Sequence, residues 1–231
     1  QRSWCAMSMP YYVPPEQFMK DRADYARKGI ARGRTLVGLQ YASGIAIISE
    51  NPSTTLHKIS EIYDRIAFAG VGKYNEFDQL RVAGVRAADL KGYQFSRQDV
   101  DARSLTNQYA QILSQMFSEA PKPMEVELLV AEIGIDPKSD RLFHVLYDGT
   151  VLDEKGFCVL GGDSESVLER LKGSFKSEMT LKEALKSAIA ALSGADRKLS
   201  HEELEVAVLE RNGRRRCFRR IDDSEIQSLV G

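Results

Sequence analysis

Apolar residues recur in this chain at two spacings, which alternate in blocks along the sequence. Short runs rich in β-branched residues predict strands, whereas longer stretches with apolar residues three and four positions apart predict helices. Strands are expected at residues 35–41, 44–49, 66–71, 126–133, 142–147, 157–160, 204–210 and 215–220. Helices are expected from Pro14-Pro15 onward, at 75–90, from Ser104 to just before Pro121, and at 165–175 and 181–192.

Local signals mark where several of these elements begin or turn. The Ser104 hydroxyl can cap one helix, and Thr180 with Glu183 forms a capping-box pattern at another. Asn212-Gly213 is a strong signal for a hairpin between the last two strands. Proline fits a first helical turn, so Pro14-Pro15 can open the first helix. One stripe of that helix would then carry Phe18, Arg22, Tyr25, Ala26 and Gly29.

The order of the blocks bounds the fold class. Strands, two helices, strands, two helices and strands place helical pairs on separate faces of sheet material, in an α+β arrangement. Two packed antiparallel sheets between helical layers fit this order, and so does an ordinary single α+β sheet. Since no linker or low-complexity tract divides residues 14–231, we expect one domain there, preceded by a short segment at 1–13.

Composition removes several classes of function. A formal net charge of -1 gives no general reason to expect a nucleic-acid partner. No apolar run approaches the roughly 20 residues that span a bilayer, and residues 1–12 lack the apolar core of a signal peptide, so we expect a cytoplasmic protein without a membrane partner. Cys5, Cys158 and Cys217 are odd in number and lack CxxC spacing, so we expect no disulfide framework, metal site or cofactor.

One segment carries most of the information about family. A charged turn with a single lysine runs into a nearly uncharged strand, and this region resembles proteasome α subunits, in particular those of actinobacteria. The resemblance extends from about Met9 onward and implies the four-layer αββα sandwich of N-terminal nucleophile hydrolases. The motifs that carry it are Leu56–Arg65 with Ile66–Lys73, Pro15-Glu16-Gln17, Ala26–Gly33, Glu50–Ser53 and Lys73–Phe77.

The catalytic residues of that fold are not expected here. Catalytic relatives expose a threonine as the chain terminus, where its own amine activates its hydroxyl with help from an aspartate and a lysine. The candidate, Thr35, follows Arg34 instead of the glycine of a processing site. The family's spacings place Asn51 at the aspartate position and Ala67-Phe68 near the lysine position. An active threonine hydrolase of the same fold is therefore kept only as an alternative.

Other catalytic patterns are no better supported. The chain has no GxSxG or HExxH motif, and His57, His144 and His201 lie on different expected elements. Residues 70–73 match the end of a phosphate-loop motif over a short stretch, but Tyr74 replaces the required Ser or Thr.

Two surfaces follow from the resemblance. Lys58 is expected in a pocket between adjacent α subunits, where its ammonium would pair with the C-terminal carboxylate of an activator. Gly72 is a further candidate for lining this pocket. A glycine at a strand end can also serve a turn. Met9, Pro10, Tyr11 and Tyr12 are expected to form part of a gate at the ring axis. Residues 1–6 do not match the family and receive no role.

A basic cluster supports a competing hypothesis. Arg214, Arg215, Arg216, Arg219 and Arg220 could contact phosphate, which would fit a nucleic-acid-binding scaffold. The expected hairpin instead places them on an edge strand, where charge prevents unwanted sheet pairing, and acids lie nearby in sequence. We therefore favour edge protection and expect no nucleic-acid partner.

The resemblance thus implies a non-catalytic α subunit of a bacterial 20S proteasome. Such a subunit forms seven-membered rings with neighbouring α subunits, stacks against proteolytic β subunits and gates the entry of unfolded protein substrates. It also docks a ring ATPase, which in actinobacteria delivers proteins tagged with a small protein modifier.

Overall fold

The computed structural model describes residues 13–195 and 197–231. Its strands are β1 (Leu36–Tyr41), β2 (Gly44–Glu50), β3 (Ile59–Tyr63), β4 (Ile66–Gly72), β5 (Val126–Glu132), β6 (Arg141–Val145), β7 (Val151–Glu154), β8 (Phe157–Leu160), β9 (Leu204–Glu210) and β10 (Phe218–Ile221). Its helices are α1 (Pro15–Ala31), α2 (Tyr74–Gln94), α3 (Ala102–Glu119), α4 (Ser164–Ser174), α5 (Leu181–Ser193) and α6 (Asp223–Val230). Short 3₁₀ turns occupy Arg97–Asp99, Pro137–Ser139 and His201–Glu203.

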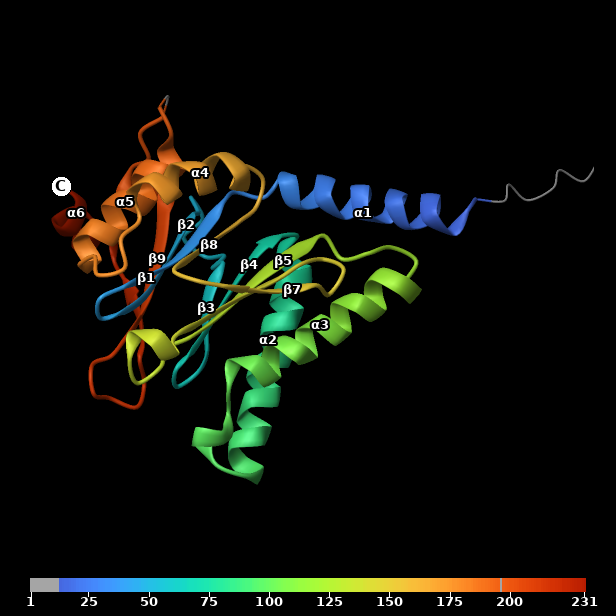
Figure 1. The fold of residues 1–231 in the computed structure, drawn as a ribbon, viewed down its shortest axis with the longest axis horizontal. Helices are drawn as coiled ribbons and strands as arrows, with labels where there is room; N and C mark the ends of the chain where they lie inside the picture. The colour runs from blue at the N-terminus through green and yellow to red at the C-terminus, as the bar shows by residue number, and fades with distance from the viewer. Residues whose placement is uncertain (1–12, 196) are drawn as a thin grey trace, which may run out of the picture.

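These elements form four layers (Figure 1). One sheet has the strand order β10-β9-β2-β1-β8 and the other β3-β4-β5-β6-β7, and the paired strands of both are antiparallel. Helices α4 and α5 pack on the first sheet and α2 and α3 on the second. The expected αββα sandwich is confirmed, and the alternative of a single α+β sheet is wrong.

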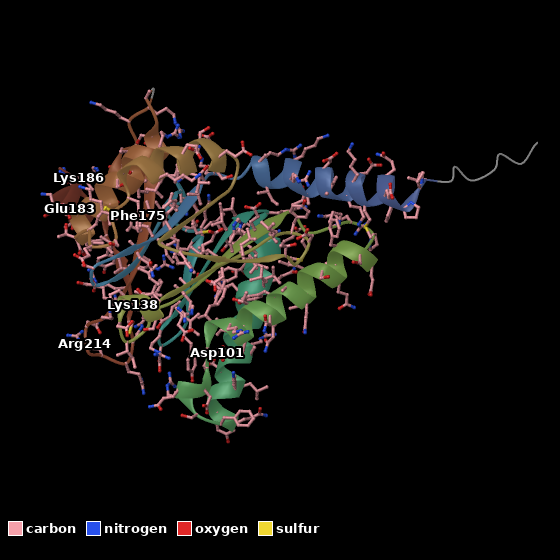
Figure 2. The ribbon with its side chains drawn as sticks, in the orientation of Figure 1. Asp101, Lys138, Phe175, Glu183, Lys186 and Arg214 are labelled. Carbon is pink, nitrogen blue, oxygen red and sulfur yellow. The ribbon has the colours of Figure 1, made fainter. Side chains whose placement is uncertain are left out.

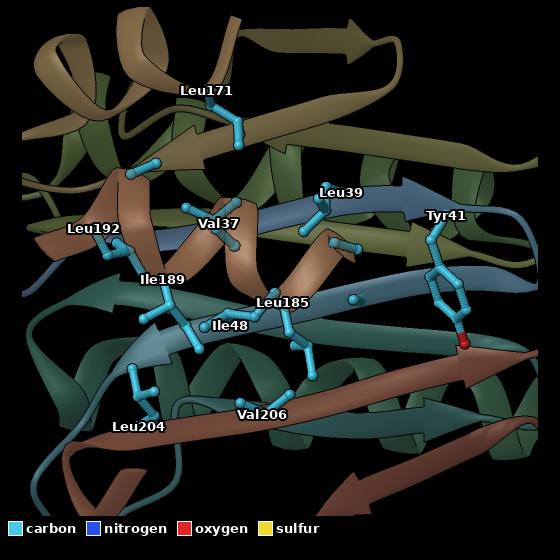
Figure 3. Packing of buried hydrophobic residues seen from close by; sticks show 14 of the residues in the cluster. Val37, Leu39, Tyr41, Ile48, Leu171, Leu185, Ile189, Leu192, Leu204 and Val206 are labelled. Carbon is cyan, nitrogen blue, oxygen red and sulfur yellow. The ribbon is translucent and has the colours of Figure 1, made fainter. Parts of the chain in front are cut away.

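Strand alternation explains why three apolar layers form. Successive side chains on a strand point to opposite faces, so an apolar strand can contribute to a helix–sheet layer and to the sheet–sheet layer at once. In β4, Phe68 packs toward α2 and α3, whereas Ala67 and Ala69 pack between the sheets. Figure 3 shows the first helix–sheet layer, where Leu185, Ile189 and Leu192 of α5 lie over Val37, Leu39 and Ile48.

Helix α1 projects beyond the sandwich (Figure 1); its C-terminal half packs against β4 and β5, and a buried arginine ties it to α3. Arg22 donates to the carbonyl oxygens of Met116, Phe117 and Ala120, at 3.1, 2.6 and 2.8 Å. These carbonyls lie at the C-terminal end and C-cap of α3, where helical carbonyls lose their backbone donors and the helix dipole is negative; the Met116 carbonyl also accepts the Ala120 amide. Arg22 therefore caps α3 and sets the position of α1.

Several expectations about individual elements need correction. The stripe expected on α1 buries Arg22 and Ala26, but Phe18 and Tyr25 are exposed because α1 packs along only part of its length. Asp101, not Ser104, caps α3, since the Asp101 carboxylate accepts the Ser104 amide at 2.8 Å. The Thr180–Glu183 capping box is confirmed.

The last hairpin and two strands also differ from expectation. Asn212-Gly213 lies in a seven-residue connection, 211–217, because β10 starts only at Phe218; the expected strand at 215–220 is therefore too early. Strands β3 and β7 were not expected. β3 has a bulge after Glu61 and β7 is mostly exposed, so neither has a simple apolar alternation.

Candidate functional site

The loop before β3 returns the chain to the sheets and presents Lys58. Asn51 closes this loop, because its side chain accepts the Ser53 amide at 3.1 Å and donates to the Leu56 carbonyl at 2.7 Å. Its backbone amide donates to the Glu203 carbonyl at 2.7 Å. The position where the family's spacings would place a catalytic aspartate thus holds a residue that shapes this loop.

Glu205 on β9 fixes the backbone on either side of the lysine side chain. Its carboxylate accepts the amides of Lys58 and Ile59, at 2.8 and 3.1 Å. The same carboxylate accepts the Asn51 side chain and the Arg220 guanidinium, each at 2.8 Å. Because four donors converge on one nearly buried carboxylate, the loop is joined to the end of the first sheet.

The Lys58 ammonium lies between two carbonyl oxygens. It donates to the carbonyls of Arg34 and Glu50, both at 3.2 Å. An ammonium has three donors, so one N–H remains for a further acceptor. Burial lowers the pKa of Lys58 to about 8, while Glu205 and Glu50 act in the opposite direction.

The surrounding charges leave a positive excess. The Glu50 carboxylate is nearly buried and pairs with the guanidinium groups of Arg34 and Arg197. Four cationic side chains thus lie near three carboxylates, an excess of one positive charge that favours an anionic partner. The cations are Lys58, Arg34, Arg197 and Arg220, and the carboxylates are Glu50, Glu203 and Glu205.

Gly72 borders the segment that Lys58 contacts. It ends β4 with φ of 108°, and a Cβ there would collide with the Glu125 carbonyl, so both backbone conformation and space require glycine. A Cβ at Gly33 would lie 3.0 Å from the Gly72 amide nitrogen. Gly72 therefore lies beside 33–34, while Lys58 bonds to the carbonyl of Arg34. The structural demands on this glycine exist whether or not it lines a pocket.

Thr35 is engaged in the interior. It is 7% exposed, and its hydroxyl accepts the Asp163 amide at 3.3 Å. Its nitrogen is part of the peptide bond with Arg34, whose carbonyl accepts a hydrogen bond from Lys58. Ala67 and Phe68 are completely buried apolar residues. The arrangement lacks the free amine that would activate a threonine nucleophile.

The arginine cluster is paired largely within the chain. Arg216 contacts Glu61 at 2.6 Å, Arg220 contacts Glu205 at 2.8 Å, and Arg219 bridges Glu210 and Glu225. Arg219 and Arg220 lie on the edge strand β10, as expected, whereas 214–216 belong to the loop before it, where Figure 2 labels Arg214. This pairing supports edge protection and intramolecular bridging over phosphate binding.

Several contributors to the site have no sequence signal. Glu205 and the carbonyl of Arg34 lie far from Lys58 along the chain, and the carbonyl of Glu50 lies eight residues before it, at the end of β2; folding brings all three to the lysine. The expected gate residues Met9, Pro10, Tyr11 and Tyr12 lie outside the described residues. Among the described helices, none combines the length and apolarity needed to cross a bilayer.

Comparison with known proteins agrees with this architecture. Residues 30–209 match the proteasome subunit family. A protein of Acidimicrobium ferrooxidans named "Proteasome subunit alpha" is 59% identical over 225 residues, covering 97% of both chains. Proteins of the same name from Thermomonospora curvata and Kineococcus radiotolerans are 54% and 53% identical; each comparison covers 97% of this chain and 98% of the relative. The αββα sandwich and these similarities show that the chain belongs to the proteasome subunit family, among its non-catalytic alpha subunits.

Proposed function

We propose that this chain forms the outer, seven-membered rings of a bacterial 20S proteasome, gates substrate entry and docks a ring ATPase. The observation that carries the docking role is the Lys58 ammonium, which is partly desolvated, has one donor left and lies in a positive surround. The chain belongs with the alpha-type subunits, which implies that it assembles with other proteasome subunits. The proteolysis itself is assigned to β subunits, and the substrates are unfolded, tagged proteins in transit.

A closed ring needs two different complementary patches on each subunit. The exposed side of α1 supplies one, since Phe18, Met19 and Tyr25 are each at least 40% exposed on a helix that projects from the body (Figure 1). We assign this face to the neighbouring α subunit. The complementary patch would receive the projecting helix.

A second apolar surface lies at the far end of α2. Tyr93, Phe95 and Ile135 are 90%, 74% and 89% exposed, which is unusual for large apolar side chains unless a partner covers them. We assign this tip to contact with the stacked β ring. Two separated apolar surfaces fit a subunit that has one partner within its ring and another across it.

Docking of an activator tail follows from the chemistry of Lys58. A terminal carboxylate that accepts the third N–H forms a charge-assisted hydrogen bond, and the positive excess offsets the desolvation of the carboxylate. A single contact is weak, but several tails on one ring bind together through their effective concentration. On an assembled ring, a tail peptide with a free carboxyl terminus should bind and its amidated form should bind at least about tenfold more weakly; equal binding would reject this docking mode.

We infer further that the segment before α1 contributes to the gate. This inference rests on the family resemblance and on the place of Met9–Tyr12 in the sequence, immediately before a projecting helix. Deleting residues through Tyr12 should speed cleavage of short peptides by the assembled particle while leaving cleavage at the β sites unchanged in specificity. Equal rates before and after deletion would reject the gate.

Electron microscopy of the chain mixed with its β subunit tests the assembly proposal. Stacked rings with sevenfold symmetry are expected. Tyr25→Asp should prevent ring closure, whereas Phe95→Asp should allow α–α contacts but block stacking with β. A monomer that never associates with a β subunit, or variants that affect both contacts alike, would contradict the assignment.

A further inference from the structure

A cluster of metal-ligating side chains lies where the chain crosses from one sheet to the other. β7 is the outer strand of one sheet and β8 the outer strand of the other, and only Lys155 and Gly156 separate them. His144 of β6, Glu154 of β7 and Cys158 of β8 each offer one ligand atom here, and these atoms lie within 4.8 Å of one another. Side chains from three strands of two sheets therefore form one polar cluster.

The register shows why these side chains converge. His144 pairs with Leu129, whose side chain belongs to the sheet–sheet layer, and Leu142, two residues before, belongs to the same layer. Glu154 pairs with Leu142, and Cys158 is itself part of this layer. Since alternate residues share a face, His144, Glu154 and Cys158 all point into the space between the sheets.

An independent observation points to a missing ligand. His144 is 8% exposed, and its Nε2 is buried with no hydrogen-bond partner. A buried polar atom without a partner is costly, and an ion is one of the few agents that can satisfy it. A Glu127 carboxylate oxygen lies 3.4 Å from this nitrogen, outside hydrogen-bonding geometry but close enough to join it around a cation.

We propose that His144, Glu154 and Cys158 bind a divalent cation of the zinc class between the two sheets. Imidazole, thiolate and carboxylate together are the donor set that Zn²⁺ takes, whereas Ca²⁺ and Mg²⁺ require oxygen ligands throughout. Three protein ligands leave one position of a tetrahedral ion, which Glu127 beside His144 can fill only if its side chain moves toward the other two ligands.

The distances require a small contraction. Metal–ligand bonds of about 2.0 to 2.3 Å in a tetrahedron place the ligand atoms about 3.3 to 3.7 Å apart. The ligand atoms of His144, Glu154 and Cys158 are at most 4.8 Å apart, so a pair at that limit must close by about 1 Å, and the partly exposed Glu154 side chain has room to rotate. A thiol binds the metal as a thiolate, so the Cys158 proton is released to solvent on binding.

Cobalt titration of the full chain tests this proposal. After chelator treatment and dialysis, the protein should bind one Co²⁺ per chain with a thiolate-to-cobalt absorption band, and Zn²⁺ should displace the cobalt and raise the melting temperature. Cys158→Ser should abolish the band and weaken Zn²⁺ binding by about 100-fold or more, and His144→Gln should weaken binding similarly. Cys217→Ser and His201→Gln are matched controls, since neither residue belongs to the cluster.

Glu154→Gln provides a variant whose folding is not in question, because Glu154 is only partly buried. It should keep the far-ultraviolet circular dichroism of the wild type and weaken Zn²⁺ binding by about tenfold or more. No cobalt band in the wild type, a band that survives Cys158→Ser, or a band lost in Cys217→Ser would each overturn the proposal. In that case the cluster is an ordinary buried histidine–glutamate contact beside a buried thiol.

Discussion

The lowered pKa of Lys58 predicts that its ammonium costs folding stability, and that this cost disappears as pH rises. In the unfolded chain the lysine has its ordinary value of 10.5, whereas in the fold burial lowers it to about 8. The folded state then binds fewer protons than the unfolded state between these two values, so stability increases with pH across this window. The full difference corresponds to about 3 kcal/mol.

Lys58→Met isolates this effect, because it keeps a side chain of similar length without the charge. The free energy of unfolding of the wild type, minus that of Lys58→Met, should rise by about 2 kcal/mol between about pH 7.5 and about pH 9.5. Urea unfolding followed by circular dichroism at several pH values, at equal protein concentration, measures this difference. Lys138→Met, at an exposed lysine, should show no such trend.

A flat difference, or one that falls with pH, would refute the reasoning. It would mean that the two carbonyls and the neighbouring acids compensate the desolvation of the ammonium completely. The same titration governs docking, since a carboxylate binds the protonated lysine. Tail binding should therefore weaken above about pH 8, by about tenfold for each further pH unit.

Other changes test how the site is held. Arg22→Ala should lower the free energy of unfolding by about 2 to 4 kcal/mol and impair ring assembly, because α3 loses its cap and α1 its anchor, whereas Lys20→Ala on the same helix should do neither. Gly72→Ala should lower the free energy of unfolding by about 2 kcal/mol or more, because its backbone is left-handed and a Cβ collides with the Glu125 carbonyl. Gly173→Ala, whose Cβ would meet nothing within 4 Å, should leave stability unchanged or raise it, and thermal unfolding measures both. Glu205→Gln should cost about 3 kcal/mol in chemical unfolding and weaken tail binding, since four donors lose a charged acceptor.

Apolar periodicity predicts most helices and strands of this fold, because it reports which faces must be covered, but it left a single sheet open, and the four layers were expected from the family resemblance. The helix that begins after Thr180 is specified locally by its capping box, and it forms as expected. β3 was not predicted, because a bulge after Glu61 interrupts its alternation and its start is fixed from another strand, where Glu205 accepts the amides of Lys58 and Ile59. Local patterns contain no information about such a partner.

The candidate site divides in the same way. Lys58 was found from a motif, but the features that make its ammonium suitable for docking come from residues such as Arg34 and Glu50, which folding brings to it. The metal-ligating cluster around His144 and Cys158 was not expected from spacing, since its ligands come from separate strands and form no local motif. Clusters of this kind become visible only when register and burial are known.

The measurement that tests the central claim most directly is degradation of a tagged protein by the assembled α/β particle at limiting ring ATPase. Lys58→Ala should leave assembly and the cleavage of short peptides unchanged and reduce ATPase-stimulated degradation by at least about tenfold, because every docked tail loses its charge-assisted contact. Lys138→Ala should behave as the wild type. Unchanged stimulation by Lys58→Ala would show that activator docking does not depend on this lysine and would contradict the account.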